Sequence, residues 1–234
     1  MLKLTFLGTG SAMVTKEYNT CFILSQDNYK LLVDCGGGHE ILRQFKDNNL
    51  SIGEIDTIFI THSHADHILG FPFIFREMIW SQKRITIICS LQVKTDLEFL
   101  IRMDIPDQVE KNKHLLDFHI IDQHSSYKNL HFLKVDDRQH GFVLQDKEKK
   151  ITFLGDAPLR GYMLRDCDIV ICEAFCSKDD NVKITGKHQT IEEVLKLGEE
   201  KEIKKLIITH TFTDLRRFSS GKIIIPRKGD TIIV

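Results

Sequence analysis

Five short apolar runs in this chain each end in a residue with metal-binding chemistry. The residues that follow these runs are Asp34, His62, Asp156, Glu173 and His210. Short apolar runs bounded by polar residues are typical of buried β-strands. The carboxyl ends of strands in a sheet usually present catalytic or binding groups to a crevice. The pattern therefore predicts a strand-rich fold with a functional site at the strand ends.

The rest of the chain alternates between strand-like and helical patterns. Strand-like segments are expected at 2–7, 21–24, 31–33, 57–61, 85–89, 118–121, 130–135, 142–145, 151–154, 169–172, 206–209 and 223–225. Helical periodicity is expected over 38–47, 70–82, 91–103 and 190–201. Thr190 and Glu193 have the spacing of a capping box. Because no repeat or Pro/Ser-rich linker interrupts the chain, we interpret residues 1–234 as one domain of the layered α/β class.

Composition excludes several classes of protein. The 234 residues, 42% of them hydrophobic, suffice for a sizeable core. The chain has 32 Lys and Arg and 33 Asp and Glu, so its net charge is close to zero and no overall positive field attracts a polyanion. The longest apolar stretch, 68–75, is shorter than the ~20 residues of a membrane span, so we expect no membrane contact and a cytosolic location. The six cysteines form no close CxxC pair and are expected to be reduced core residues.

Residues 61–67, Thr-His-Ser-His-Ala-Asp-His, hold the densest set of metal-binding side chains. His62 and His64 are two positions apart and share one face of an extended backbone. Asp66 and His67 follow after a turn and can reach a second point nearby. Imidazole nitrogen and carboxylate oxygen suit Zn²⁺, Mn²⁺ or Fe. The sequence therefore predicts a metal site here; the alternative is a solvated polar loop.

This HxHxDH motif after a strand resembles that of the metallo-β-lactamase superfamily. Three other motifs match in order: Asp34 after an early strand, Asp156 in a Gly-Asp pair and His210 at a late strand end. The resemblance implies a four-layer αββα sandwich with two divalent metal ions, Zn²⁺ first and Mn²⁺ or Fe as alternatives, between the sheets.

The resemblance also implies a role for each of these residues. By it, His62 and His64 bind one metal, Asp66, His67 and His210 bind the other, and Asp156 bridges the two. Asp34 would orient a metal ligand through hydrogen bonds.

The superfamily places one more histidine ligand between the HxHxDH and Gly-Asp motifs. His140 has this chemistry but directly precedes Gly141, whereas Asp136 and Asp137 lie nearer the usual spacing. The sequence predicts His140 as this ligand, and it leaves open the two aspartates or an ordinary histidine before a strand.

Three further motifs are similar to those of the ribonuclease Z and phosphodiesterase branch. Residues 6–12 with 18–20 resemble its opening loop, Glu173-Ala-Phe resembles its His-Glu-Ala-Thr motif, and His188-Gln-Thr resembles its His-Ser-Thr motif. The resemblance implies a metal-dependent hydrolase, a phosphodiesterase or endoribonuclease, whose metals acidify the attacking water. We expect Asp66 to orient this water, His188 to protonate the leaving alkoxide and Glu173 to adjust the charge of His188. Backbone N–H groups of residues 8–11 would bind phosphate oxygens.

The range of expected substrates is limited by the lack of a segment that would bind transfer RNA. Ribonuclease Z enzymes grip transfer RNA with a Gly- and Pro-rich arm, and the stretch between His67 and Asp156 holds no such basic tract. We therefore expect a small phosphodiester rather than precursor transfer RNA, with RNA kept as an alternative.

Two other functions stay open. The HxHxDH motif does not by itself specify a phosphodiester substrate, so the chain could instead hydrolyse a lactone or a thioester. The second alternative is a metal-binding module without catalytic activity. The resemblance also implies a homodimer.

Overall fold

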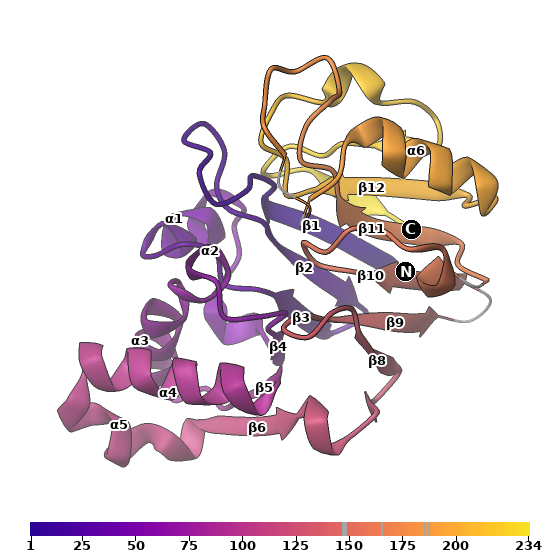
Figure 1. Ribbon diagram of the computed structural model, residues 1–234. Coiled ribbons are helices and arrows are strands. Elements are labelled where there is room, and N and C mark those ends of the chain that lie inside the picture. The colour runs from indigo at the N-terminus through magenta and orange to yellow at the C-terminus, as the bar shows by residue number, and fades with distance from the viewer. Residues whose placement is uncertain (147–148, 165, 185, 187) are drawn as a thin grey trace. The chain divides into compact units, whose positions relative to one another are not determined.

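The computed structural model of the chain describes residues 1–146, 149–164, 166–184, 186 and 188–234. These residues form two compact units, the first from residues 1–124 with 227–234 and the second from residues 125–226. Each unit is built on a seven-stranded β-sheet flanked by helices (Figure 1). The layered α/β class is therefore confirmed, and the grouping of residues 1–234 into one domain stays a prediction.

The first unit has the strand order β14-β1-β2-β3-β4-β5-β6. The strands are β1 (Leu2–Gly8), β2 (Cys21–Gln26), β3 (Tyr29–Val33), β4 (Thr57–Phe59), β5 (Ile85–Cys89), β6 (Leu116–Ile120) and β14 (Thr231–Ile233). The helices are α1 (Glu40–Asp47), α2 (Ala65–Ile68), α3 (Phe71–Ser81), α4 (Leu91–Asp104) and α5 (Pro106–Asn112), with single 3-10 turns at Ile52–Glu54, Lys113–Leu115 and Ile121–Gln123. Strands β3 to β6 pair in parallel, so their carboxyl ends meet at one edge of the sheet.

Helices α1, α3 and α4 share a hydrophobic core with this sheet. Phe45 of α1, Phe75 of α3 and Leu97 of α4 belong to one buried cluster with Ile58 of β4 and Ile87 of β5. Side chains alternate along a strand, so one face of the sheet supplies this core.

Gly70 allows the chain before α3 to approach the loop after β3. A Cβ at this position would lie 2.0 Å from the backbone oxygen of Cys35, closer than any side chain allows. This close approach draws the chain after α2 towards the end of β3.

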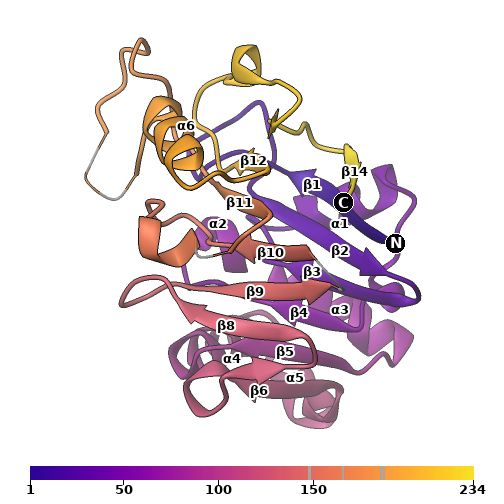
Figure 2. The same cartoon turned by 90° about the vertical axis from the view of Figure 1, so that its right-hand side faces the viewer.

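The second unit has the strand order β13-β12-β11-β10-β9-β8-β7. The strands are β7 (Ser126–Tyr127), β8 (Leu130–Lys134), β9 (His140–Asp146), β10 (Lys149–Phe153), β11 (Ile169–Glu173), β12 (Lys205–Thr209) and β13 (Ile223–Ile224). The helical elements are α6 (Ile191–Glu200) and single 3-10 turns at Gly161–Leu164 and Arg216–Phe218. Strands β10 to β13 pair in parallel. Both views show α6 lying along β11 and β12 (Figure 2).

The start of α6 is determined by its sequence. The Thr190 hydroxyl accepts a hydrogen bond from the backbone of Glu193, whose side chain accepts one from the backbone of Thr190, so the predicted capping box is confirmed. Ile191 and Val194 belong to one buried cluster with Val170 of β11 and Ile208 of β12.

Every expected strand and helix is present, with some ends shifted by a few residues. The sequence did not predict β7, β14, α2 and α5, which are short. Strand β14 exists because Ile233 pairs with Lys3 at the other end of the chain, a contact without a local signal. None of the helices in the described part of the chain is long and apolar enough to cross a membrane.

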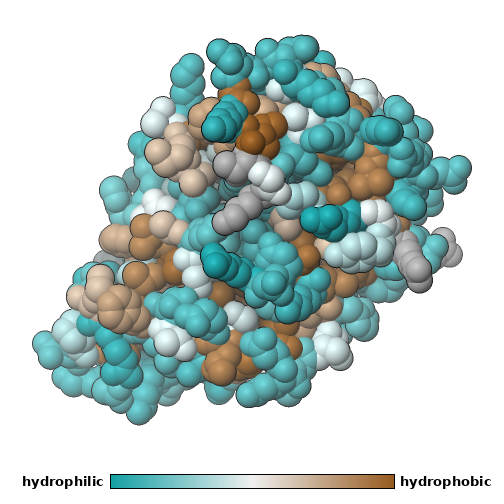
Figure 3. Space-filling view, viewed as in Figure 1, coloured by the Kyte–Doolittle hydropathy of each residue, from teal (hydrophilic) through white to brown (hydrophobic). Residues whose placement is uncertain are grey.

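The surface is mixed in polarity, and the cysteines lie beneath it. The face in Figure 3 is mostly hydrophilic, with apolar side chains in separate groups. All six cysteines are buried and free, as expected of core residues. Burial, together with the nearby Asp34 carboxylate, raises the pKa of the Cys21 and Cys35 thiols.

Candidate active site

His62 and His64 form a pair of nitrogen donors in the first unit. Both follow β4, and His64, whose backbone is extended, is the residue before α2. Nε2 of His62 lies 2.9 Å from Nδ1 of His64. A tetrahedral zinc ion with bonds of about 2.0–2.1 Å places neighbouring ligand atoms roughly 3.3 Å apart. The pair therefore fits a metal ion with little movement.

Helix α2 carries the second pair, Asp66 and His67. Nε2 of His67 lies 3.3 Å from Oδ2 of Asp66, the spacing expected of two ligands of one metal. Nδ1 of His67 lies 2.8 Å from Oδ2 of Asp34, so this N–H donates to a carboxylate and leaves Nε2 as the nitrogen for a metal.

Asp34 orients one histidine of each pair. It is 1% exposed and has a left-handed backbone, with a φ of 57°, directly after β3. Its carboxylate accepts hydrogen bonds from the backbone N–H of Thr61 at 2.9 Å and from the Thr61 hydroxyl at 3.0 Å. Because this hydroxyl donates its proton to Asp34, it accepts from Nδ1 of His62, 2.9 Å away. Asp34 thus orients His67 directly and His62 through Thr61.

Asp156, Glu173 and His210 lie together in the second unit. They follow or end β10, β11 and β12, and because these strands are parallel neighbours their carboxyl ends meet. Nε2 of His210 lies 3.2 Å from Oδ2 of Asp156, and Nδ1 of His210 lies 3.2 Å from Oε2 of Glu173. One nitrogen of His210 therefore faces the Asp156 carboxylate, and the other is held by the buried carboxylate of Glu173.

His188 shares the same carboxylate oxygen. Its Nδ1 lies 2.9 Å from Oε2 of Glu173, and its side chain is 26% exposed. The donor atoms of Glu173, His188 and His210 all lie within 4.8 Å of one another. Because Nδ1 of His188 donates to Glu173, Nε2 is the nitrogen left for a substrate.

His140 is the buried one of the three alternatives for the remaining ligand. It begins β9, opposite Lys134 of β8. Oδ1 of Asp136 accepts hydrogen bonds from the backbone of Arg138 and of Gln139 and so closes a turn. The side chain of Asp137 is 100% exposed. Burial favours His140, whose metal-binding role stays a prediction.

The opening loop lies beside Asp66 within the first unit. The side-chain amide of Asn19 donates to the backbone oxygen of Ser11. A Cβ on Gly37 would lie 2.5 Å from Oδ1 of Asn19 and 3.8 Å from Cα of Asp66, so the glycine allows this close packing. One loop N–H, that of Gly10, already donates to Tyr18. Phosphate binding by the other N–H groups stays a prediction.

Some residues of the site carried no recognisable signal in the sequence. Thr61 precedes the HxHxDH motif as an ordinary strand-end residue, yet its hydroxyl joins Asp34 to His62. Phe175 and Phe212 each lie two positions after a predicted site residue, Glu173 and His210, but no sequence spacing reveals that their rings stack.

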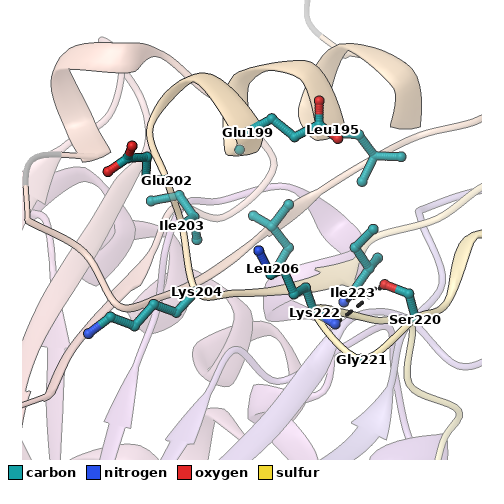
Figure 4. A pocket seen from close by; sticks show the side chains of 11 residues that line it. Leu195, Glu199, Glu202, Ile203, Lys204, Leu206, Ser220, Gly221, Lys222 and Ile223 are labelled. Atoms are coloured by element: carbon teal, nitrogen blue, oxygen red, sulfur yellow. Dashed lines mark hydrogen bonds between the residues drawn. The ribbon is translucent and has the colours of Figure 1, made fainter.

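A pocket of about 750 Å³ in the second unit lies away from these residues. It is formed between the end of α6 and β13, and Leu195, Ile203, Leu206 and Ile223 supply its apolar lining (Figure 4). Leu206 is near the start of β12, whereas His210 follows the end of that strand. The pocket thus lies at the opposite end of β12 from His210.

Comparison with known proteins identifies the relatives of this chain. A relative called anti-Pycsar protein Apyc1, from Bacillus phage vB_BveM-Goe7, is 46% identical over 69 residues, which are 29% of this chain and 26% of the relative. The ribonuclease Z of Staphylococcus saprophyticus is 32% identical over 137 residues, 55% of this chain and 42% of that enzyme. These alignments cover less than half of either relative.

The fold is shared with solved structures over almost the whole chain. The metallo-beta-lactamase fold protein YhfI from Bacillus subtilis is 18% identical, with a TM-score of 0.74 over 99% of this chain and 98% of that protein. This likeness confirms the predicted metallo-β-lactamase fold, and the alignment with the ribonuclease Z relative confirms the predicted resemblance to that enzyme. The family model described as anti-Pycsar protein Apyc1 matches residues 2–222. The chain belongs to the anti-Pycsar Apyc1 family.

Proposed function

We propose that the chain is a metal-dependent phosphodiesterase. The observation that carries this proposal is the spacing of donor atoms within each unit. Three pairs, His62 with His64, Asp66 with His67, and Asp156 with His210, have donor atoms 2.9 to 3.3 Å apart. Family membership and the ribonuclease Z relative support the choice of phosphodiester chemistry.

We propose two divalent metal ions, zinc first, with manganese or iron as alternatives. His62, His64 and His140 would hold one ion, Asp66, His67 and His210 the other, and Asp156 both. This assignment rests on the resemblance and on the donor spacing inside each unit. When bound, the ions would supply the positive charge that acidifies a water and stabilises charge on the phosphate oxygens.

The residues of the chain would then bind, orient and move protons. Asp66 would orient the attacking water. His188 would give its Nε2 proton to the leaving oxygen while Nδ1 keeps its own proton, held by Glu173. The buried carboxylate therefore stabilises the protonated donor before transfer and keeps its ring in place afterwards.

The proposed substrate is a small phosphodiester, and a cyclic nucleotide is the first to test. Degradation of cyclic nucleotides fits the anti-Pycsar family, and the sequence between His67 and Asp156 has no Gly- and Pro-rich arm, so both favour this substrate over transfer RNA. RNA is the second candidate. A cytosolic location and a homodimer stay predictions from the sequence.

Metal analysis coupled to a hydrolysis screen tests this function. We expect about two metal ions per chain, and hydrolysis of bis(p-nitrophenyl) phosphate and of a 3′,5′-cyclic nucleotide without hydrolysis of lactones or thioesters. His64→Ala should lose both a metal and the activity, whereas His131→Ala, an exposed histidine of β8, should lose neither. Full activity in His64→Ala would refute the site. Activity on lactones or thioesters alone would support the rival hydrolase, and no turnover after metal loading would support a binding module.

A further inference from the structure

The ring of His188 belongs to an aromatic stack. The ring of Phe175 lies 4.4 Å from that of His188, centroid to centroid, with an angle of 17° between the planes. The ring of Phe212 lies 5.0 Å from that of Phe175, at an angle of 12°. Three nearly parallel rings from separate loops of the second unit are therefore packed face to face.

The backbone holds Phe175 at the centre of this stack. Phe175 follows the end of β11 by two residues, and its N–H donates to the backbone oxygen of Gln189 at 2.9 Å. The N–H of Phe212 donates to the backbone oxygen of Phe175 at 2.7 Å. Phe175 is thus tied to the segment that carries His188 and to the loop after His210.

The hydrogen bond to Glu173 does not by itself determine the plane of the imidazole. A ring held only through Nδ1 can tilt about the N–H···O axis, and such a tilt swings Nε2 away from its target. A parallel aromatic contact opposes this tilt, because tilting one ring breaks its face contact with the other. The carboxylate and the phenylalanine therefore restrain different motions of the same side chain.

We propose that Phe175 is a positioning residue that holds the imidazole plane of His188, so that its Nε2–H points at the leaving oxygen. This inference rests on the proposed phosphodiesterase function. It is specific to this chain's Glu-Ala-Phe motif, since a threonine in place of Phe175 has no ring to stack. A purely structural role for Phe175 would instead lower stability and affect every substrate alike.

The test uses two phosphodiesters of one nucleotide that differ only in the leaving group. One releases p-nitrophenolate, which needs no proton, and the other releases an alkoxide, which does. We expect Phe175→Leu to lower kcat for the alkoxide ester roughly 10- to 100-fold and for the p-nitrophenyl ester less than about threefold. Phe175→Tyr keeps an aromatic ring at this position and should hydrolyse both esters at the rates of the wild type. Phe218→Leu is the matched control, because Phe218 is a half-buried phenylalanine of the same unit and is not one of the three stacked rings.

A double variant and an NMR spectrum add two further checks, and the spectrum requires no enzymatic activity. In His188→Ala, adding Phe175→Leu should cause no further loss on the alkoxide ester, because the residue it positions is gone. In the metal-free protein, ring-proton NMR signals of His188 should be shifted upfield by the Phe175 ring, and Phe175→Leu, or Phe175→Met if the leucine variant is unstable, should remove this shift.

The outcomes separate this inference from the proposed function. Equal losses on both esters, or no loss on either, would overturn the positioning role, as would a His188 signal unaffected by removing the ring. A wild-type protein that hydrolyses neither ester after metal loading would overturn the proposed function instead.

Discussion

Glu173 holds His188 through a single carboxylate oxygen, whose distance to Nδ1 of the imidazole is 2.9 Å. The same oxygen lies 3.2 Å from Nδ1 of His210, and Glu173 is fully buried. One side chain therefore orients a proposed metal ligand and a proposed proton donor. Because both contacts converge on one atom, a change at Glu173 affects metal binding and proton transfer together.

Glu173→Gln should lower both turnover and metal affinity by roughly 10- to 100-fold. The amide keeps the shape of the side chain but loses the negative charge, and its oxygen accepts more weakly from two histidines. Steady-state rates and a chelator competition measure the two effects. Glu199→Gln, on the exposed face of α6, is the control. Loss of turnover with full metal affinity would show that His210 does not depend on Glu173.

Asp34→Asn should weaken metal binding in the first unit and lower the free energy of unfolding by about 1–3 kcal/mol. Asp34 accepts from Thr61 and His67, and an amide would turn a donor towards one of them. Urea unfolding and metal titration check the two effects, with the exposed Asp47→Asn as control. An unchanged metal affinity would contradict the orienting role of Asp34.

Adding Zn²⁺ to the metal-stripped protein should raise its Tm by several degrees. A free metal concentration of about 1,000 times Kd stabilises the folded protein by about 4 kcal/mol. His67→Ala should reduce this rise, since it removes a donor atom that lies 3.3 Å from Asp66. Differential scanning calorimetry with and without metal measures the shift. The metal prediction fails if His67→Ala shows the full rise in Tm.

Asp180 should make stability depend on pH in the acid range. The hydroxyl of Thr213 donates to its carboxylate at 2.6 Å and the N–H of Ser177 at 2.8 Å, and these hydrogen bonds hold the pKa of Asp180 below its usual range. A carboxyl whose pKa is lowered on folding stabilises the protein above the pKa of the unfolded chain, about 3.9, and loses this effect as pH falls through the lower folded value.

Asp180→Asn should therefore be less stable than wild type at pH 5–7 by about 1 kcal/mol, a difference that shrinks below about pH 4. Urea unfolding at a series of pH values measures it. Asp179→Asn, at the exposed neighbour, should leave the pH profile of the wild type unchanged. A constant difference between Asp180→Asn and wild type at every pH would contradict the assignment.

The sequence by itself determined the strands, the main helices and the proposed metal ligands that lie nearest to one another along the chain. Apolar runs form strands because burial follows local periodicity, so the predicted strands at 85–89 and 169–172 correspond to β5 and β11. The HxHxDH motif is equally local, because His62 to His67 lie on one short loop and the turn that follows it. Such features can be predicted from neighbouring residues alone, because they do not depend on contacts with distant parts of the chain.

The tertiary structure decided which side chains form hydrogen bonds or ring contacts with each other. Glu173 and His210 are 37 positions apart, and their contact exists because β11 and β12 pair in parallel register. Strand β14 forms only because the last residues pair with β1. The stacking of Phe175 on His188 and the link from Asp34 through Thr61 to His62 likewise depend on where loops meet. Such contacts depend on how strands and loops from distant parts of the chain pack together, so they cannot be predicted from the spacing of residues in the sequence.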